Sequence, residues 1–254
     1  MASILRINNL SIQIKKQQVL QNITFEIGEG EVVLLSGLNG IGKSTLLKSI
    51  LRLENEDKTI DGEIYVRGYG DVLRLEAVEL QRFRSRIAYV PQTDDYAQMG
   101  NIQVKDIINE SSQSNSGKVL STKQVNELID KWIPRRSDGK RVFDAKAKPA
   151  KFSGGEQRLL SVLSIIATRS KAELLIVDEP LNNLDFLNVR HISNLINKVI
   201  HDNPKIAVLM ISHCRIFPFI TREIILTDEG IREASEHYTC HSCFGEPDKD
   251  GYYK

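Results

Sequence analysis

The first third of the chain interleaves β-branched apolar residues with polar ones, which is the pattern of half-buried strands. The expected strands cover residues 4–14, 19–27, 31–35, 62–68 and 86–90, and the expected helices cover residues 45–53 and 72–84. A Lys-Lys-Gln-Gln turn separates the first two strands. This third therefore predicts an N-terminal antiparallel β subdomain that leads into a buried strand.

The middle of the chain, from residue 93 to residue 151, has fewer apolar positions. Its serine-rich stretch at 111–116 (SSQSNS) is expected to be a loop. Ser121 and Gln124 form a capping box, which predicts the start of a helix that runs to about Trp132. We interpret residues 93 to about 165 as an inserted α-helical subdomain.

The last third again alternates strand and helix patterns. Apolar strands are expected at 174–177 and 206–211, and between them the apolar positions from Ile192 to Ile200 mark one face of a helix. Such alternation predicts a mainly parallel sheet covered on both faces, hence an α/β fold. We expect one domain over residues 1–235 and a polar C-terminal tail over residues 236–254.

The composition excludes several classes of protein. Among 254 residues, 34 Lys and Arg balance 33 Asp and Glu, so a net charge of +1 gives no broad basic face for nucleic acid. No run approaches the ~18 apolar residues of a membrane span, and the N-terminus has no secretory pattern. Three cysteines are too few for a disulfide framework. A cytoplasmic protein is expected.

Residues 37–45 (GLNGIGKST) fit the phosphate-loop pattern G-x-x-x-x-G-K-[ST]. In this pattern glycines let backbone N–H groups face the phosphates, Lys43 adds a charge, and the Ser44 hydroxyl ligates Mg²⁺. An apolar strand precedes the loop and a helix follows, as that chemistry requires. The expected nucleotide contacts are Gly37, Asn39, Gly40, Gly42, Lys43, Ser44 and Thr45.

A second candidate segment is the apolar strand that ends in Asp178 and Glu179. Acidic residues at the carboxyl edge of a parallel sheet lie where phosphate ligands bind. Asp178 is suited to hold Mg²⁺, and Glu179 to polarise the attacking water. Together with the phosphate loop, this pair predicts hydrolysis of a nucleoside triphosphate.

Residues 152–157 (FSGGEQ) closely resemble the L-S-G-G-Q signature of the ABC ATPase family. Three further segments resemble motifs of that family in the same order: 89–92 (YVPQ) the Q-loop, 180–185 (PLNNLD) the D-loop, and 211–213 (ISH) the H-loop. The resemblance covers residues 4 to 234. Because all the motifs occur in order, it is highly specific.

The resemblance implies a P-loop NTPase core and a head-to-tail dimer around two ATP molecules, each facing Ser153, Gly154 and Gly155 of the other chain. It further implies that Glu179 is the general base, that His213 holds the γ-phosphate, and that Gln92 contacts Mg²⁺ or the water. The implied Mg²⁺ ligands are Ser44, Gln92 and Asp178. Asp185 would link the two sites. Three of these residues have an alternative that isolated evidence favours: Gln92 as a loop polar group, His213 as a strand-end histidine and Asp185 as a helix N-cap. The order and spacing of the motifs favour the functional roles.

Three positions depart from the family pattern. Ile14 stands where an aromatic residue usually stacks on adenine, so preference for ATP over GTP stays open. Asn182 replaces the common D-loop serine, and Glu156 replaces the signature glutamine. None of these changes removes a hydrolytic residue.

The tail contains His237, Cys240, His241 and Cys243, all of them metal-ligand types. A closed zinc site normally draws on two separated pairs, and only one cluster is present. An exposed polar tail is therefore favoured over a metal site.

The favoured function is the ATP-hydrolysing subunit of an ABC transporter. It would pair with a second ATPase subunit, act at the inner face of a membrane and drive membrane-spanning partner subunits. Its sequence does not specify the substrate, the direction of transport or whether the dimer pairs identical chains. The alternative is a soluble ABC ATPase for an assembly process such as iron–sulfur cluster biogenesis. A P-loop kinase would leave the signature unexplained, and nucleic acid is not an expected partner.

Overall fold

The computed structural model describes residues 2–53, 58–92, 96, 100–136, 138–182, 184–212 and 217–234. The chain divides into two compact units. The first unit draws on Met1–Ile87, Ala172–Glu179 and Pro204–Cys240, and the second on Ala88–Lys171, Pro180–Asn203 and His241–Lys254.

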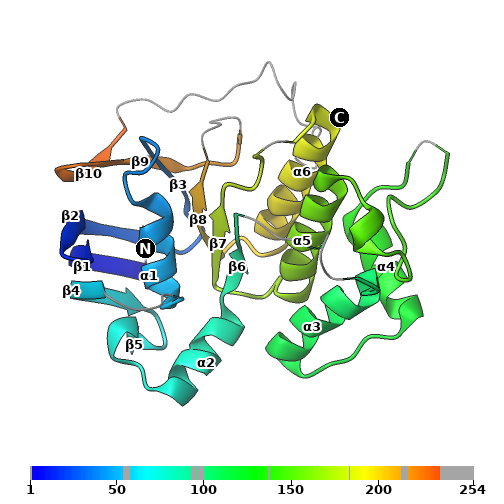
Figure 1. The fold of residues 1–254 in the computed structure, drawn as a ribbon, viewed down its shortest axis with the longest axis horizontal. Helices are drawn as coiled ribbons and strands as arrows, with labels where there is room; N and C mark the ends of the chain where they lie inside the picture. The colour runs from blue at the N-terminus through cyan, green and yellow to red at the C-terminus, as the bar shows by residue number, and fades with distance from the viewer. Residues whose placement is uncertain are drawn as a thin grey trace. The chain divides into compact units, whose positions relative to one another are not determined.

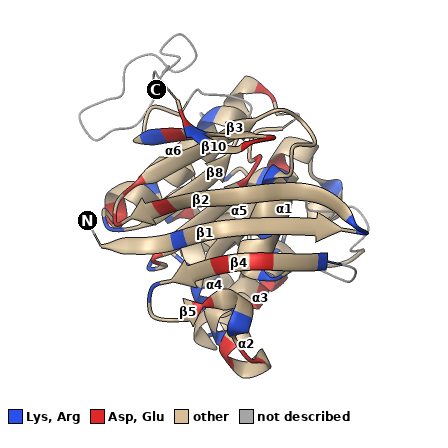
Figure 2. Cartoon of the chain, turned by 90° about the vertical axis from the view of Figure 1, so that its left-hand side faces the viewer, with Lys and Arg blue, Asp and Glu red and all other residues tan. Residues whose placement is uncertain are grey.

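An antiparallel sheet opens the first unit, with strand order β2-β1-β4-β5. Its strands are β1 (Ser3–Ile14), β2 (Gln17–Gly28), β4 (Lys58–Val66) and β5 (Gly70–Asp71). Leu5 of β1 pairs with Ile27 and Val66, so one apolar face runs across three strands. Figure 2 shows this sheet face-on with charges of both signs scattered over it, in agreement with the balanced composition.

A mainly parallel sheet forms the core of the same unit, in the order β10-β9-β3-β8-β7. Its strands are β3 (Val32–Gly37), β7 (Leu174–Asp178), β8 (Ala207–Ile211), β9 (Arg222–Thr227) and β10 (Gly230–Glu233). β3 runs parallel to both β8 and β9, while β10 is antiparallel to β9. Every residue of β7 and β8 is buried, which explains their uninterrupted apolar sequences.

Helix α1 (Lys43–Leu51) begins directly after the phosphate loop and packs against β3 and β7 (Figure 1). The helix expected at 72–84 is instead two pieces, a 3₁₀ turn η1 (Val72–Arg74) and helix α2 (Ala77–Arg86). Asp71 caps the first piece by accepting a hydrogen bond from the Leu73 N–H at 3.1 Å. Arg84 of α2 donates to the Leu51 carbonyl at 2.8 Å, which anchors α2 to the end of α1.

The second unit is helical apart from the short strand β6 (Ala88–Val90). Its other elements are α3 (Val104–Ser116), α4 (Thr122–Trp132), the 3₁₀ turn η2 (Pro149–Lys151), α5 (Gly154–Thr168) and α6 (Phe186–Asp202). Figure 1 shows α5 in the middle of this unit, and α3, α4 and α6 all contact it. The capping box of Ser121 and Gln124 is present, as the sequence predicts.

The expectation of a loop at residues 111–116 is wrong, because these residues complete α3. Serine has a weak helix preference, so propensity alone does not explain the helix. Tertiary contacts with the end of α5 do: the Ser111 and Thr168 hydroxyls lie 2.8 Å apart, and Asn115 donates to the Thr168 carbonyl at 2.7 Å. Gly117 then ends the helix in a left-handed conformation.

The fold class predicted from the sequence is confirmed: an antiparallel β subdomain, a mainly parallel core and a helical portion. Strands β9 and β10 were not among the expected elements. The boundary of the inserted subdomain at residues 93–165 and the separate tail stay predictions. In the described ranges, no helix combines the length and apolar character needed to cross a membrane.

Candidate active site

The phosphate loop joins β3 to α1 at the carboxyl edge of the parallel sheet, where α/β folds bind ligands. Gly37 adopts a φ of 140°, and a Cβ atom there would lie 2.6 Å from the Leu226 carbonyl oxygen of β9. Only glycine fits this turn, because both the dihedral angle and the close backbone exclude a side chain. Gly37 therefore allows the chain to turn sharply between the end of β3 and the start of α1.

Lys43 lies inside this loop and is buried, with 6% of its surface exposed. Its ammonium group donates to the carbonyl oxygens of Gly37 and Leu38, both at 2.9 Å. Burial lowers the pKa of Lys43, while the nearby carboxylates of Glu179 and Asp178 oppose that shift. The loop thus surrounds one positive charge, and phosphate oxygens can replace the two carbonyl oxygens as hydrogen-bond partners of Lys43.

Two acidic residues face α1 from the end of β7. The Ser44 hydroxyl donates to a carboxylate oxygen of Asp178 at 3.4 Å, and Asp178 is 1% exposed. Glu179 follows with a φ of 45°, and its N–H donates to the Ile211 carbonyl of β8 at 2.9 Å. Such a backbone conformation is uncommon for glutamate and is typical of functional positions. A hydroxyl and a carboxylate side by side are oxygen ligands that suit Mg²⁺.

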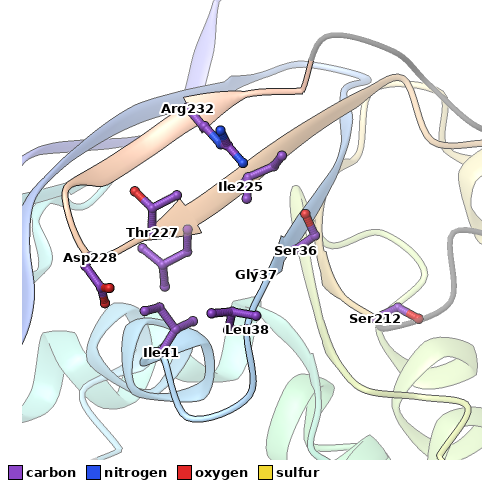
Figure 3. A pocket seen from close by; sticks show the side chains of 10 residues that line it. Ser36, Gly37, Leu38, Ile41, Ser212, Ile225, Thr227, Asp228 and Arg232 are labelled. Atoms are coloured by element: carbon purple, nitrogen blue, oxygen red, sulfur yellow. The ribbon is translucent and has the colours of Figure 1, made fainter.

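A cavity of about 520 Å³ lies beside the loop, on the side of β9. Figure 3 shows Leu38 and Ile41 of the phosphate loop facing Thr227 and Asp228, with Arg232 reaching over from β10. The phosphate loop thus has open space on one side. On its other side it lies against β2, since a Cβ atom at Gly42 would meet the Leu20 side chain at 2.7 Å.

The signature segment, residues 152–157, begins helix α5 in the second unit. Ser153 is its N-cap: the Ser153 hydroxyl accepts from the Glu156 N–H at 3.2 Å, and the Glu156 carboxylate accepts from the Ser153 N–H at 3.0 Å. Ser153 and Gly154 are exposed. A helix N-terminus with exposed serine and glycine is suited to bind an anion.

Helix α6 begins at the end of the D-loop and contacts the signature segment. Asp185 caps α6 by accepting from the Asn188 N–H and from its side-chain amide, both at 2.9 Å. These hydrogen bonds lower the pKa of Asp185, that from the Asn188 backbone most. The Asn188 amide fills the space next to Gly155, where a Cβ atom would lie 2.2 Å from its nitrogen. The signature segment is therefore in direct contact with α6, whose N-cap is the last residue of the D-loop.

Comparison with known proteins identifies the family. The family model described as ABC transporter matches residues 20–182. The chain is 31% identical over 205 residues to a probable ABC transporter ATP-binding protein of Cyanophora paradoxa, covering 81% of this chain and 78% of that protein. An energy-coupling factor transporter ATP-binding protein, EcfA2 of Caldanaerobacter subterraneus, is 32% identical over 76% of this chain and 63% of its own length. This chain belongs to the ABC transporter ATP-binding family.

Solved structures agree with the fold. The dimeric structure of a bacterial ABC transporter cassette superposes with a TM-score of 0.74 at 22% identity, covering 93% of this chain and all of that one. A dimeric post-hydrolysis cassette bound to ADP and phosphate gives a TM-score of 0.70 at 21% identity, over 93% of this chain and 100% of its own. As a family member, the chain is an ATPase.

The predicted site residues of this ABC ATPase are divided between the two units. The first unit contains the phosphate-loop and β7 residues Gly37, Asn39, Gly40, Gly42, Lys43, Ser44, Thr45, Asp178 and Glu179. The second unit contains Gln92, Ser153, Gly154, Gly155 and Asp185. His213 and the four ligand-type residues of the tail lie outside the described residues. The described residues contain no group of three or more His, Cys, Asp or Glu suited to hold a metal ion.

Sequence reasoning missed Arg158, which lies in the apolar stretch of α5. It is 8% exposed and donates to the carbonyl of Pro91, the neighbour of Gln92. It also donates to the carbonyl of Pro180 at 3.2 Å, at the start of the D-loop. One buried guanidinium thus joins two motif segments of the second unit, the Q-loop and the D-loop, to α5. No local pattern reveals it, because both partners are distant in sequence.

Proposed function

We propose that this ABC ATPase is the ATP-hydrolysing subunit of a membrane transporter, in which two subunits enclose two ATP molecules. The observation that carries the proposal is the arrangement of Lys43, Ser44, Asp178 and Glu179 around one loop end. Buried ammonium and backbone N–H groups suit a triphosphate, and the adjacent carboxylates suit metal binding and proton abstraction.

The proposed roles follow from position. Lys43 would exchange its two carbonyl partners for phosphate oxygens, at no loss of hydrogen bonds. Ser44 and Asp178, with Gln92, would hold Mg²⁺, which neutralises the charge of the phosphates when bound. Glu179 would accept the proton of the attacking water. Ser153, Gly154 and Gly155 of the second subunit would bind the γ-phosphate at the start of α5, and Asp185 would link the two sites.

Substitution of the general base tests this assignment. Glu179→Gln preserves shape but removes the base, so we expect ATP binding to persist, a stable dimer to accumulate with ATP, and turnover to fall by at least about 10²-fold. Labelled-nucleotide binding, size-exclusion chromatography and phosphate release measure the three effects.

Lys43→Ala is the matched control, because it removes the cation that faces the phosphates. It is expected to lose ATP binding and, with it, the dimer. Near-normal hydrolysis by Glu179→Gln, or unchanged ATP affinity of Lys43→Ala, would contradict the assignment.

We place the membrane-spanning partner at a cavity of about 320 Å³ in the second unit. The cavity lies between α3 and α5, and its apolar lining comes from Tyr96, Ile102, Ile107 and Ile165. Arg169 also lines it. The Arg169 guanidinium donates to the Ser111 hydroxyl and, at 2.6 Å, to that of Ser114, and burial lowers its pKa. Asp106 and Glu110 line the same cavity, so its charged groups are two carboxylates and one guanidinium. Such a site suits a cytoplasmic segment of the partner that brings an apolar side chain and a basic one. The subunit would then act at the cytoplasmic face of the membrane.

A further inference from the structure

A loop between α4 and α5 is held by side-chain hydrogen bonds to both helices. Toward α4, Asp130 accepts from Arg135 at 2.8 Å and from two nitrogens of Arg141 at 2.8 and 2.6 Å. The hydrogen bond from Arg141, then that from Arg135, lowers the pKa of Asp130. Within the loop, the Arg136 N–H donates to the Lys140 carbonyl at 2.8 Å. The described residues of this loop are therefore held in place although they carry little sequence pattern.

Toward α5, the same loop contacts the signature segment through Arg136. One guanidinium nitrogen donates to a Glu156 carboxylate oxygen at 2.9 Å and to the Val142 carbonyl at 3.2 Å. The other Glu156 oxygen accepts from the N–H and the hydroxyl of Ser153, at 3.0 and 3.2 Å. Arg136 is therefore connected to Ser153 through one carboxylate.

The charge of Glu156 has two opposite effects at this helix end. A carboxylate in the first turn stabilises the helix, because it faces the positive end of the helix dipole. It also repels any second anion that approaches the same N–H groups. Arg136 offsets that repulsion, since its guanidinium places a positive charge on the carboxylate oxygen that Ser153 does not use.

We propose that Arg136 is a positioning residue for ATP hydrolysis: by neutralising Glu156, it lets the signature end of α5 receive the γ-phosphate held by the second subunit. The inference rests on the proposed function, in which Ser153 faces ATP. Arg136 itself touches no phosphate. Its influence passes through Glu156 to the electrostatic potential at the start of α5 and to the orientation of the Ser153 hydroxyl.

The expected effect of losing the Arg136–Glu156 ion pair depends on how exposed the two side chains are to solvent. The Arg136 side chain is 52% exposed and that of Glu156 is 26% exposed, so solvent screens their interaction. Loss of the pair is then expected to raise the KM for ATP by about fivefold at low salt, with kcat nearly unchanged. High salt should shrink the difference, because it screens the exposed carboxylate.

Arg136→Ala in the full chain tests this, with Arg135→Ala as the matched control. Both remove one arginine from the same loop, but Arg135 contacts Asp130 and the Gly139 carbonyl rather than the signature. We expect a higher KM for ATP and weaker ATP-driven dimerisation in Arg136→Ala alone. ADP affinity, which depends on the phosphate loop, should be equal in both variants and in the unaltered protein.

The double variant Arg136→Ala/Glu156→Gln separates charge from structure. Glutamine still caps Ser153 but has no charge, so the KM should return close to that of the unaltered protein. If Arg136 served only to fold the loop, the lost Val142 contact would keep the defect in place. Equal KM values for Arg136→Ala and Arg135→Ala, or no recovery in the double variant, would overturn the inference. Absence of Glu179-dependent hydrolysis in the unaltered protein would instead refute the proposed function.

Discussion

At the residue scale, the site combines charges that are satisfied before any substrate binds. Lys43 is held by two carbonyl groups, and Asp178 accepts from Ser44. Glu179 is fixed by its backbone contact with β8 and by a strained conformation. Because these groups are placed in advance, little rearrangement separates the resting loop from one that holds a triphosphate.

Arg158 gives the sharpest prediction at this scale. Arg158→Ala leaves the half-buried carbonyl of Pro91 and the buried carbonyl of Pro180 without this donor, which should cost about 1–3 kcal/mol of folding stability. We also expect kcat to fall while ADP affinity is retained, since Gln92 and the D-loop lose their common anchor. Thermal unfolding and steady-state hydrolysis measure the two effects.

Arg158→Lys serves as the graded control, because one ammonium group reaches a single carbonyl at a time. It should lie between the alanine variant and the unaltered protein. A variant Arg158→Ala with unchanged kcat would show that the anchor has no part in hydrolysis.

At the scale of elements, the antiparallel sheet depends on one close approach of backbone. Gly62 of β4 has a φ of 102°, and a Cβ atom there would lie 2.7 and 2.6 Å from the carbonyl oxygens of Asn8 and Asn9 in β1. Both are backbone atoms of the neighbouring strand. They can move away only if the register shift between Asn8 and Ser11 is disturbed.

Gly62→Ala is therefore expected to destabilise the protein by about 2 kcal/mol or more. Gly68→Ala is the control, because its φ of 80° carries the same kind of strain but no atom lies within 4 Å of the added methyl group. Chemical denaturation of both variants would measure the difference. Equal losses of stability would mean that dihedral strain alone, not the contact with β1, accounts for the effect.

The elements also show what a sequence can predict. β1, β2, β3 and α1 follow from periodicity, because their apolar positions match the face that each buries. The serine-rich end of α3 does not, since its stability comes from Thr168 and other groups far along the chain. The same distinction holds at the site. The sequence predicts the loop from its phosphate-binding motif and Asp178 from its place at a sheet edge, whereas the contacts of Arg158 and Arg136 have no local pattern.

At the scale of the whole molecule, the candidate chemistry is divided between two units. The first contains the residues suited to bind and hydrolyse a triphosphate, and the second contains Gln92, the signature segment and the D-loop. With a net charge of +1 the chain has no long-range field to attract a partner. Recognition of the membrane subunit proposed above would then rest on short-range contacts, such as those available in the cavity between α3 and α5.

Co-purification from gently solubilised cells tests that cavity. Glu110→Ala removes one of its two carboxylates and should reduce recovery of a multi-span membrane protein by about tenfold. Glu127→Ala, a change at a glutamate of α4 whose side chain is 62% exposed, should leave recovery unaltered. Capture of only a soluble scaffold by the unaltered protein would favour the assembly ATPase instead.

The contact between Gly155 and Asn188 limits how these two positions can change during evolution. Any side chain at position 155 requires a smaller or displaced residue at position 188, and a smaller residue 188 loses the side-chain hydrogen bond to Asp185 while the backbone one remains. Position 155 therefore cannot change first without a clash. In a lineage of such proteins, a substitution at position 155 should appear only together with, or after, one at position 188.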